Sequence, residues 1–181
     1  MFKFTETEIK GVFIIEPQVF GDERGYFMET YKEPDFKANG ITCNFVQDNQ
    51  SSSKRGVLRG LHFQKHFPQA KLVRVLSGEV FDVAVDLRKN SSTYGRWIGV
   101  LLSGENKKQF FIPRGFAHGF VVLSDYAEFA YKCDDIYHPD DEGGIAYNDP
   151  DIAVNWHFDG NVMLSEKDKH HPNLKDIKVE F

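Results

Sequence analysis

The chain has 181 residues, 14% of them aromatic with 17 phenylalanines, and its formal net charge is −5. A chain of this length can bury roughly 70% of its unfolded surface within one domain, without disulfide or metal staples. The acidic balance lacks the basic footprint of a nucleic-acid-binding protein, and no run approaches the roughly 20 apolar residues that span a bilayer.

Short apolar segments between turn residues predict an all-β fold. In chain order, we expect strands over residues 12–15, 26–31, 45–53, 58–63, 71–76, 79–87, 97–102, 109–112, 117–122 and 127–132. One short helix is predicted over residues 33–40, with Pro34 near its start and Gly40 at its end. Many short strands at this spacing are typical of a sandwich or barrel. No repeat or linker indicates a second domain, and the polar tail from Asp134 is expected to wrap the barrel.

The cysteines and the N-terminal residues indicate the cellular compartment in which the protein is expected. Cys43 and Cys133 lie far apart in the sequence, and we expect two buried free thiols in a reducing cytosol. The first residues carry charge throughout and contain no apolar signal core, which favours a cytoplasmic protein.

Residues 113–120 fit the P-x-G-x-x-H pattern of the second cupin motif. Gly115 permits a tight turn, and His118 is then expected to point inward from the next strand. The first-motif position reads His62-Phe63-Gln64, so the His-x-His pair of metal cupins is broken. A catalytic transition metal normally takes at least three protein ligands. Two widely separated histidines fall short, and no metal is expected.

Three side chains on predicted strands form a possible proton-transfer set. His62 has the only common side chain whose ordinary pKa suits a base at neutral pH. Lys71 supplies a positive charge and Tyr131 an acidic hydroxyl. Taken singly, each has a simpler interpretation: a structural histidine, a solvated lysine and a core tyrosine. Together, and beside Arg59, they favour proton transfer at carbon next to a carbonyl group.

Eight segments carry a resemblance to a known family. They match in order and spacing, and they are residues 20–27, 45–51, 56–64, 69–75, 111–120, 131–133, 137–139 and 164–168. The chain resembles the dTDP-4-dehydrorhamnose 3,5-epimerases, which are cupins of nucleotide-sugar metabolism. The resemblance implies an all-β cupin jelly roll, a double-stranded β-helix with short flanking helices, as a single domain over residues 1–181.

The resemblance also implies a role for each catalytic position. His62 matches the general base that removes the protons from C3 and C5, and Asp168 matches the carboxylate that orients it. Lys71 matches the cation that stabilises the enolate oxygen at C4. Tyr131 matches the acid that returns a proton to the opposite face of the sugar.

Further positions match substrate-binding residues of the family. Arg24, Arg59 and Lys71, with His118 nearby, are expected around the diphosphate and the C4 oxygen. Tyr137 matches the aromatic ring that stacks on thymine. The remaining expected contacts are Phe27, Glu29, Gln47, Asp48, Asn49, Glu142 and Lys167. The tail histidines His157, His170 and His171 are expected to be solvated.

The implied partner is a second copy of the chain. In a homodimer, an N-terminal arm would pair with the partner subunit, which would explain an apolar strand over residues 12–15 without a local partner. Arg24 would then reach the partner's site.

The implied reaction is the epimerisation at C3 and C5 of dTDP-4-dehydro-6-deoxy-D-glucose to dTDP-4-dehydro-L-rhamnose, in dTDP-L-rhamnose biosynthesis. No cofactor is expected, because the C4 ketone already acidifies both carbons. A related dTDP-deoxysugar 3- or 5-epimerase, or a keto-isomerase, remains an alternative. A metal-dependent cupin isomerase or dioxygenase using His62 and His118 is a further one. A non-catalytic sugar-binding cupin is disfavoured by the joint presence of His62, Lys71, Tyr131 and Asp168.

Overall fold

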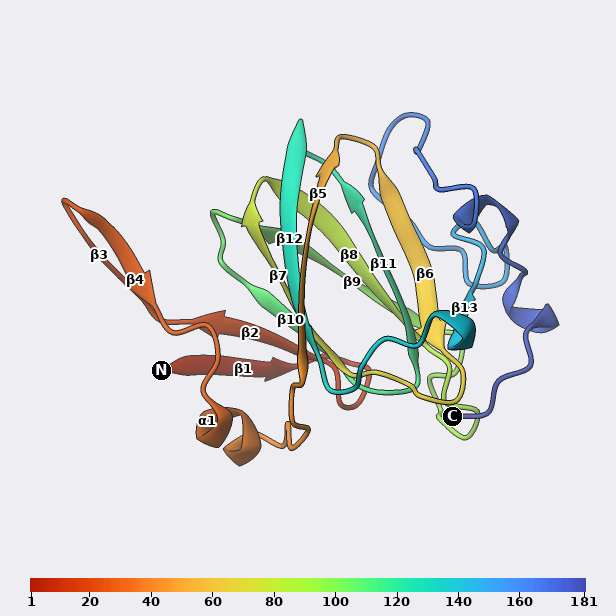
Figure 1. Ribbon diagram of the computed structural model, residues 1–181, viewed down its shortest axis with the longest axis horizontal. Helices are drawn as coiled ribbons and strands as arrows, with labels where there is room; N and C mark the ends of the chain where they lie inside the picture. Colours follow the sequence, from red (N-terminus) through yellow and green to blue (C-terminus); the bar gives the residue numbers. More distant parts are fainter.

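A computed structural model describes residues 1–181 as two facing antiparallel sheets and one projecting hairpin (Figure 1). The six-stranded sheet runs in the order β1 (Phe2–Glu6), β2 (Phe13–Pro17), β10 (Gln109–Ile112), β7 (Lys71–Ser77), β12 (Tyr126–Cys133) and β5 (Gln47–Lys54). The five-stranded sheet runs in the order β13 (Glu142–Gly144), β6 (Leu58–Gln64), β11 (Phe116–Val122), β8 (Glu79–Asp86) and β9 (Trp97–Ser103). The hairpin consists of β3 (Val19–Asp22) and β4 (Gly25–Met28).

Helical structure is confined to short flanking pieces. These are α1 (Glu33–Ala38) and the 3₁₀ turns η1 (Pro139–Asp141), η2 (Asp168–His170) and η3 (Leu174–Asp176). None of them has the length and apolar character that a membrane crossing requires. The predicted all-β jelly roll with short flanking helices is therefore confirmed. Both cysteines are free thiols, Cys133 buried and Cys43 partly buried.

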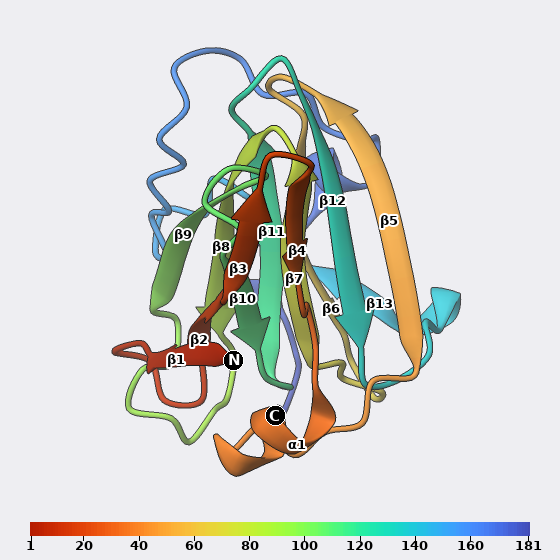
Figure 2. The same cartoon turned by 90° about the vertical axis from the view of Figure 1, so that its left-hand side faces the viewer.

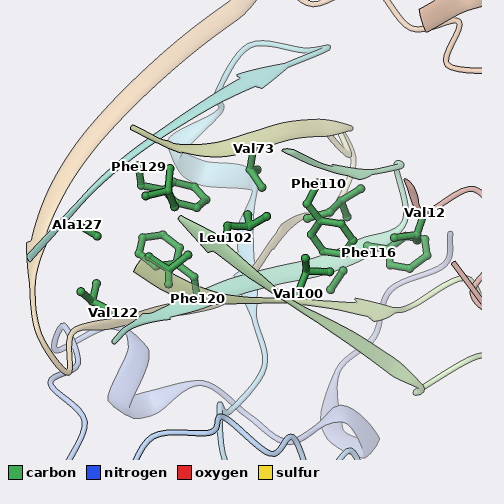
Figure 3. Packing of buried hydrophobic residues seen from close by; sticks show 14 of the residues in the cluster. Val12, Val73, Val100, Leu102, Phe110, Phe116, Phe120, Val122, Ala127 and Phe129 are labelled. Carbon is green, nitrogen blue, oxygen red and sulfur yellow. The ribbon is translucent and has the colours of Figure 1, made fainter. Parts of the chain in front are cut away.

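Apolar side chains from both sheets fill the space between them (Figure 3). Val73 and Phe110 from the six-stranded sheet meet Leu102 and Phe120 from the five-stranded sheet. Side chains along a strand point alternately to its two faces. Every second residue of β11 therefore enters this core, and the residues between them, such as Val121, face outward.

The C-terminal segment, residues 145–181, covers the outer face of the five-stranded sheet. Its buried residues Ile152, Trp156 and Leu174 pack in one cluster with outward residues such as Leu61 and Val83. Because β11 is covered on both faces, all seven of its residues are buried. The segment thus belongs to the folded body.

The N-terminal strands differ from the sequence expectation. β2 lies between two strands of its own chain, with Ile14 opposite both Thr5 of β1 and Phe110 of β10. The expectation that this strand lacks a local partner was wrong, because β1 was not predicted. The turn between β3 and β4 is short, since Asp22 already pairs with Gly25. This hairpin projects away from the two sheets in Figure 1 and lies in front of them in the view of Figure 2.

A bulge in β6 changes which residues share a face. His62 pairs with His118 and Arg59 pairs with Phe120, so three steps along β6 match two steps along β11. In a regular strand, residues three apart would point to opposite faces. The extra residue in β6 turns Arg59 and His62 to the same interior face. Gly60 makes the bulge possible: its φ is +133°, and a Cβ there would lie 2.5 Å from the Gly119 Cα.

We expect Gly60→Ala to lower the free energy of unfolding by about 2–5 kcal/mol. Left-handed strain accounts for about 1–2 kcal/mol, and overpacking against β11 adds about 1–3 kcal/mol. Gly25 offers a matched control, because its φ is +130° and nothing lies within 4 Å of an added Cβ. Gly25→Ala should cost only the strain. Equal losses for the two variants in urea unfolding would show that the close approach of β6 and β11 is not limiting.

Candidate active site

Polar side chains gather at one end of the space between the sheets. Lys71 begins β7 opposite Cys133, where β12 ends, and Tyr131 lies opposite Asn49 near the start of β5. On the other sheet, His62 lies opposite both His118 and Gly144. Lys71 lines one small pocket together with Gln64 and His118 of the other sheet, so both sets lie at the same end of the barrel.

His62 and Asp168 form the central pair of this cluster. The His62 Nε2 lies 2.6 Å from the Asp168 Oδ1, and the carboxylate side chain is only 4% exposed. Burial raises the pKa of Asp168, but the hydrogen bond and charge of His62 outweigh it, so this pKa lies below its usual value. Asp168 is therefore a carboxylate at neutral pH. It holds Nε2 and leaves the His62 Nδ1 available as a base.

A cleft of about 390 Å³ opens at His62. Arg59 lines it beside His62, as the bulge in β6 requires, and donates from Nε to Ser53 at 3.1 Å. The C-terminal segment contributes Ser165, Lys167 and Asp168 to the wall. The cleft is thus built jointly by the barrel and the tail.

Lys71 and Tyr131 come from the sheet that faces His62. The Lys71 Nζ lies 5.9 Å from the centre of the Tyr131 ring. Burial lowers the pKa of Lys71 and raises the pKa of Tyr131. The phenol therefore keeps its proton near neutral pH, as an acid requires. The structure brings all four predicted catalytic residues to one end of the barrel.

A buried histidine–carboxylate pair lies in the interior behind this group. His118 is 7% exposed, and its Nε2 lies 2.9 and 3.0 Å from the two carboxylate oxygens of the fully buried Asp82. His118 therefore supports the site from within and does not line the cleft at His62. The sequence prediction missed Asp82, although a carboxylate within the apolar run of β8 was the available signal.

The three polar residues at the start of β5 do not share a face. Gln47 and Asn49 are partly buried and joined by a 3.0 Å hydrogen bond. Asp48 points to the opposite face and accepts a 2.7 Å hydrogen bond from Lys132. The expected contact of Asp48 with the ligand is therefore not supported, because strand alternation turns it away.

Tyr137, Glu142 and Lys167 form a hydrogen-bonded group at the rim. The Tyr137 hydroxyl and the Lys167 ammonium each donate to the Glu142 Oε2 at 2.5 Å. The bond to Glu142 raises the pKa of Tyr137 to about 12. Gln64, which replaces the second histidine of a metal cupin, accepts from the His138 amide at 2.7 Å. Its amide thus braces the loop that carries Tyr137.

The hairpin residues lie apart from this cluster. Arg24 is bonded to Asp22 within the hairpin, and Phe27 is 67% exposed. Glu29 lies 3.5 Å from the N-terminal amine. Within one chain these three predicted contacts are not assembled with His62, as Figure 1 shows from the position of β3 and β4.

The tail histidines divide into two classes. His157 and His170 are exposed, as expected. The expectation for His171 was wrong, because its side chain is only 8% exposed and its Nε2 lies 3.3 Å from the Asp168 Oδ1. This nitrogen has no hydrogen-bond partner of acceptable geometry. Nothing in the local sequence distinguishes His171 from its exposed neighbour.

The sequence model of the dTDP-4-dehydrorhamnose 3,5-epimerases matches residues 6–176. The chain belongs to this family. It is 56% identical over 180 residues to the dTDP-4-dehydrorhamnose 3,5-epimerase of Methanothermobacter thermautotrophicus, covering 98% of this chain and 97% of that one. The enzyme is accordingly an isomerase.

Solved structures of family members share the fold. The 3,5-epimerase of Legionella pneumophila in complex with dTDP-4-keto-L-rhamnose has a TM-score of 0.96 and 54% identity, covering 98% of this chain and 95% of that one. A 3'-monoepimerase of Streptomyces bikiniensis in complex with dTDP-quinovose has a TM-score of 0.87 and 32% identity, covering 93% and 86%. Enzymes that act at one or at two carbons therefore share this architecture.

Proposed function

We propose that this enzyme epimerises dTDP-4-dehydro-6-deoxy-D-glucose at C3 and C5 to dTDP-4-dehydro-L-rhamnose for dTDP-L-rhamnose biosynthesis, without a cofactor. The observation that carries the proposal is the arrangement of His62 with Asp168 on one side of the barrel mouth and Lys71 with Tyr131 on the other. Its family relatives include an enzyme with dTDP-4-keto-L-rhamnose bound.

The first half of the reaction is proton removal next to the C4 ketone. The His62 Nδ1 takes the proton from C3 or C5, and the electron pair moves into the carbonyl to form an enolate. Asp168 stabilises the imidazolium that results, because its carboxylate is already bonded to the other ring nitrogen. Lys71 stabilises the negative oxygen as it forms, since its charge is already in place.

The second half is reprotonation from the opposite face. A single base would return the proton to the side from which it came, with no inversion. Tyr131 comes from the facing sheet and keeps its proton because burial raises its pKa. It is therefore suited to act as the acid on the side opposite His62.

The nucleotide part needs donors and an aromatic surface beside this centre. Arg59 and Lys167 line the cleft and suit the diphosphate. The exposed ring of Tyr137, oriented by Glu142, suits stacking on thymine. Gln47 accepts a 2.8 Å hydrogen bond from the Tyr137 amide, so β5 and this ring are fixed together.

The enzyme acts as a cytoplasmic homodimer in this proposal. The β3–β4 hairpin projects from the body and exposes apolar side chains that cost free energy in water. These side chains are Val19, Phe20, Tyr26 and Phe27. If a partner subunit covers this hairpin, Arg24, Phe27 and Glu29 of one subunit lie near the cleft of the other. The family resemblance expects these residues beside a substrate.

Loss of the base should abolish exchange at both carbons. We expect His62→Ala to lower turnover by about 10²–10⁴-fold, and Asp168→Asn to reduce it by favouring the wrong imidazole tautomer. His66→Ala is the matched control and should leave turnover unchanged. The His66 Nδ1 also lies 2.6 Å from a carboxylate, that of Asp141, but His66 does not line the cleft. Deuterium exchange at C3 and C5, followed by NMR, measures the effect. Near-normal exchange in His62→Ala would exclude His62 as the base.

Loss of the acid should separate exchange from inversion. In Tyr131→Phe, His62 still removes the proton and exchanges it with solvent, so deuterium should enter with retained configuration while epimer formation falls steeply. Tyr126→Phe is the control, because Tyr126 begins the same strand and its hydroxyl bonds to Ser77 away from the cleft. Normal yields of inverted product from Tyr131→Phe would remove Tyr131 as the acid. Inversion at one carbon only in the wild type would identify a monoepimerase.

The aromatic ring of Tyr137, and not its hydroxyl group, should supply most of this residue's contribution to nucleotide affinity. Tyr137→Ala should weaken dTDP binding by ~1–3 kcal/mol, the usual value of a base stacked on an aromatic ring. Tyr137→Phe keeps the ring, loses only the bond to Glu142, and should retain most of the affinity. Calorimetry with dTDP measures both variants. Equal dissociation constants for wild type and Tyr137→Ala would place thymine elsewhere.

A further inference from the structure

The His62–Asp168 pair has a third member that the proposed reaction does not use. His171 lies three residues after Asp168, and its ring centre is 5.6 Å from that of His62. One ligand atom from each of His62, Asp168 and His171 lies within 4.8 Å of the other two. Two imidazole nitrogens and a carboxylate oxygen form a ligand set that zinc and similar metals accept.

The buried state of His171 is the second observation. Its side chain is 92% removed from solvent, and its Nε2 lies 3.3 Å from the Asp168 carboxylate without a hydrogen bond of acceptable geometry. A buried polar atom without a partner is costly. Ligands of a tetrahedral zinc ion, bound at 2.0–2.2 Å, lie about 3.3 Å apart. The separation of His171 and Asp168 already fits such an ion, and His62 needs to retreat from Asp168 by less than about 1 Å.

The surroundings hold His171 in place and give an ion a route to it. Gly144, which pairs with His62 in the sheet, leaves the space that the ring fills, because a Cβ there would overlap the His171 imidazole. A second cleft of about 660 Å³ is lined by His171 and Gly144 on the side away from Arg59. Lys167, which lines both clefts, donates to Glu142 and makes no hydrogen bond to Asp168.

We propose that His62, Asp168 and His171 form a binding site for Zn²⁺ or a similar divalent transition metal, and that the ion reversibly inhibits the enzyme. The site binds through the His62 Nε2, the Asp168 carboxylate and the His171 Nε2, and water or a solvent ligand completes the coordination. The inhibitory effect rests on the proposed role of His62 as the base. Metal binding itself does not.

Inhibition follows from the tautomer of His62. Without metal, the Nε2 carries the proton shared with Asp168, and the Nδ1 lone pair is free. A metal at Nε2 needs that lone pair, so the ring proton moves to Nδ1. The Nδ1 then has no lone pair with which to take a proton from the sugar. Because the ion sits behind the imidazole, we expect zinc to lower kcat with little change in KM.

The test compares wild type with His171→Leu and His171→Gln after exhaustive chelation, each variant measured against its own rate without metal. Loss of a group that only hydrogen-bonds to a metal ligand changes metal affinity roughly 10–100-fold, so loss of a ligand itself should raise the inhibition constant for Zn²⁺ at least about 10-fold. Gly144→Ala should act in the same direction by displacing His171. Zinc should inhibit His170→Ala, which changes the exposed neighbour of His171, as strongly as it inhibits wild type. The substrate diphosphate binds some zinc, but equally in every variant.

A titration with Co²⁺ in the absence of substrate tests the site directly. One equivalent should give the visible absorption of a low-coordinate cobalt site in wild type and His170→Ala, and not in the His171 variants. Equal zinc inhibition in all variants, or no cobalt spectrum in wild type, would overturn the proposed site. Loss of activity on chelation alone would instead overturn the cofactor-independent reaction, which is a separate outcome.

Discussion

The hydrogen bond between His62 and Asp168 joins two parts of the chain that are 106 residues apart. The carboxylate is nearly fully buried and needs a donor, and the imidazole needs one nitrogen held so that the other is free. The tail can supply Asp168 because Ile152, Trp156 and Leu174 pack it against the outer face of the five-stranded sheet. Orientation of the His62 imidazole therefore depends on apolar packing on the far side of β6.

The charged groups in the barrel interior gather towards one end, where apolar side chains flank them. The cluster of fifteen buried residues reaches this polar end, since Ile112 lies opposite Lys71, and its burial offsets the cost of the polar groups. Within that polar end, Asp82 and His118 satisfy each other, so neither is left as an isolated buried group. Lys71 differs, since burial lowers its pKa and no hydrogen bond compensates it. The buried Lys71 ammonium is stabilised by a nearby negative charge, such as the charge of an enolate.

Strand periodicity was sufficient to predict β5 to β12, because these strands alternate or are uniformly apolar between clear turns. It did not reveal β3, which is fully exposed, or β1, whose alternation is limited to Phe2 and Phe4. The resemblance to the family assigned roles to His62, Lys71, Tyr131 and Asp168, which the residues alone left open. Alternation along β5 already contained the reason to set Asp48 apart from Gln47 and Asn49. The bulge at Gly60 and the burial of His171 depend on contacts between distant segments, and local sequence does not encode them.

The tail that carries Asp168 is attached to the barrel by backbone hydrogen bonds on both sides of that residue. Near its middle, Met163 exchanges hydrogen bonds with Gly56 and Leu58, and at its end the Phe181 carbonyl accepts from the Lys89 amide at 3.2 Å. These attachments can open without unfolding the sheets, because local opening costs less than global unfolding. Asp168 thus sits on a segment whose attachment to the barrel is separate from the pairing of the strands. Heating that loosens this segment before the sheets unfold would part Asp168 from His62 while the barrel remains folded.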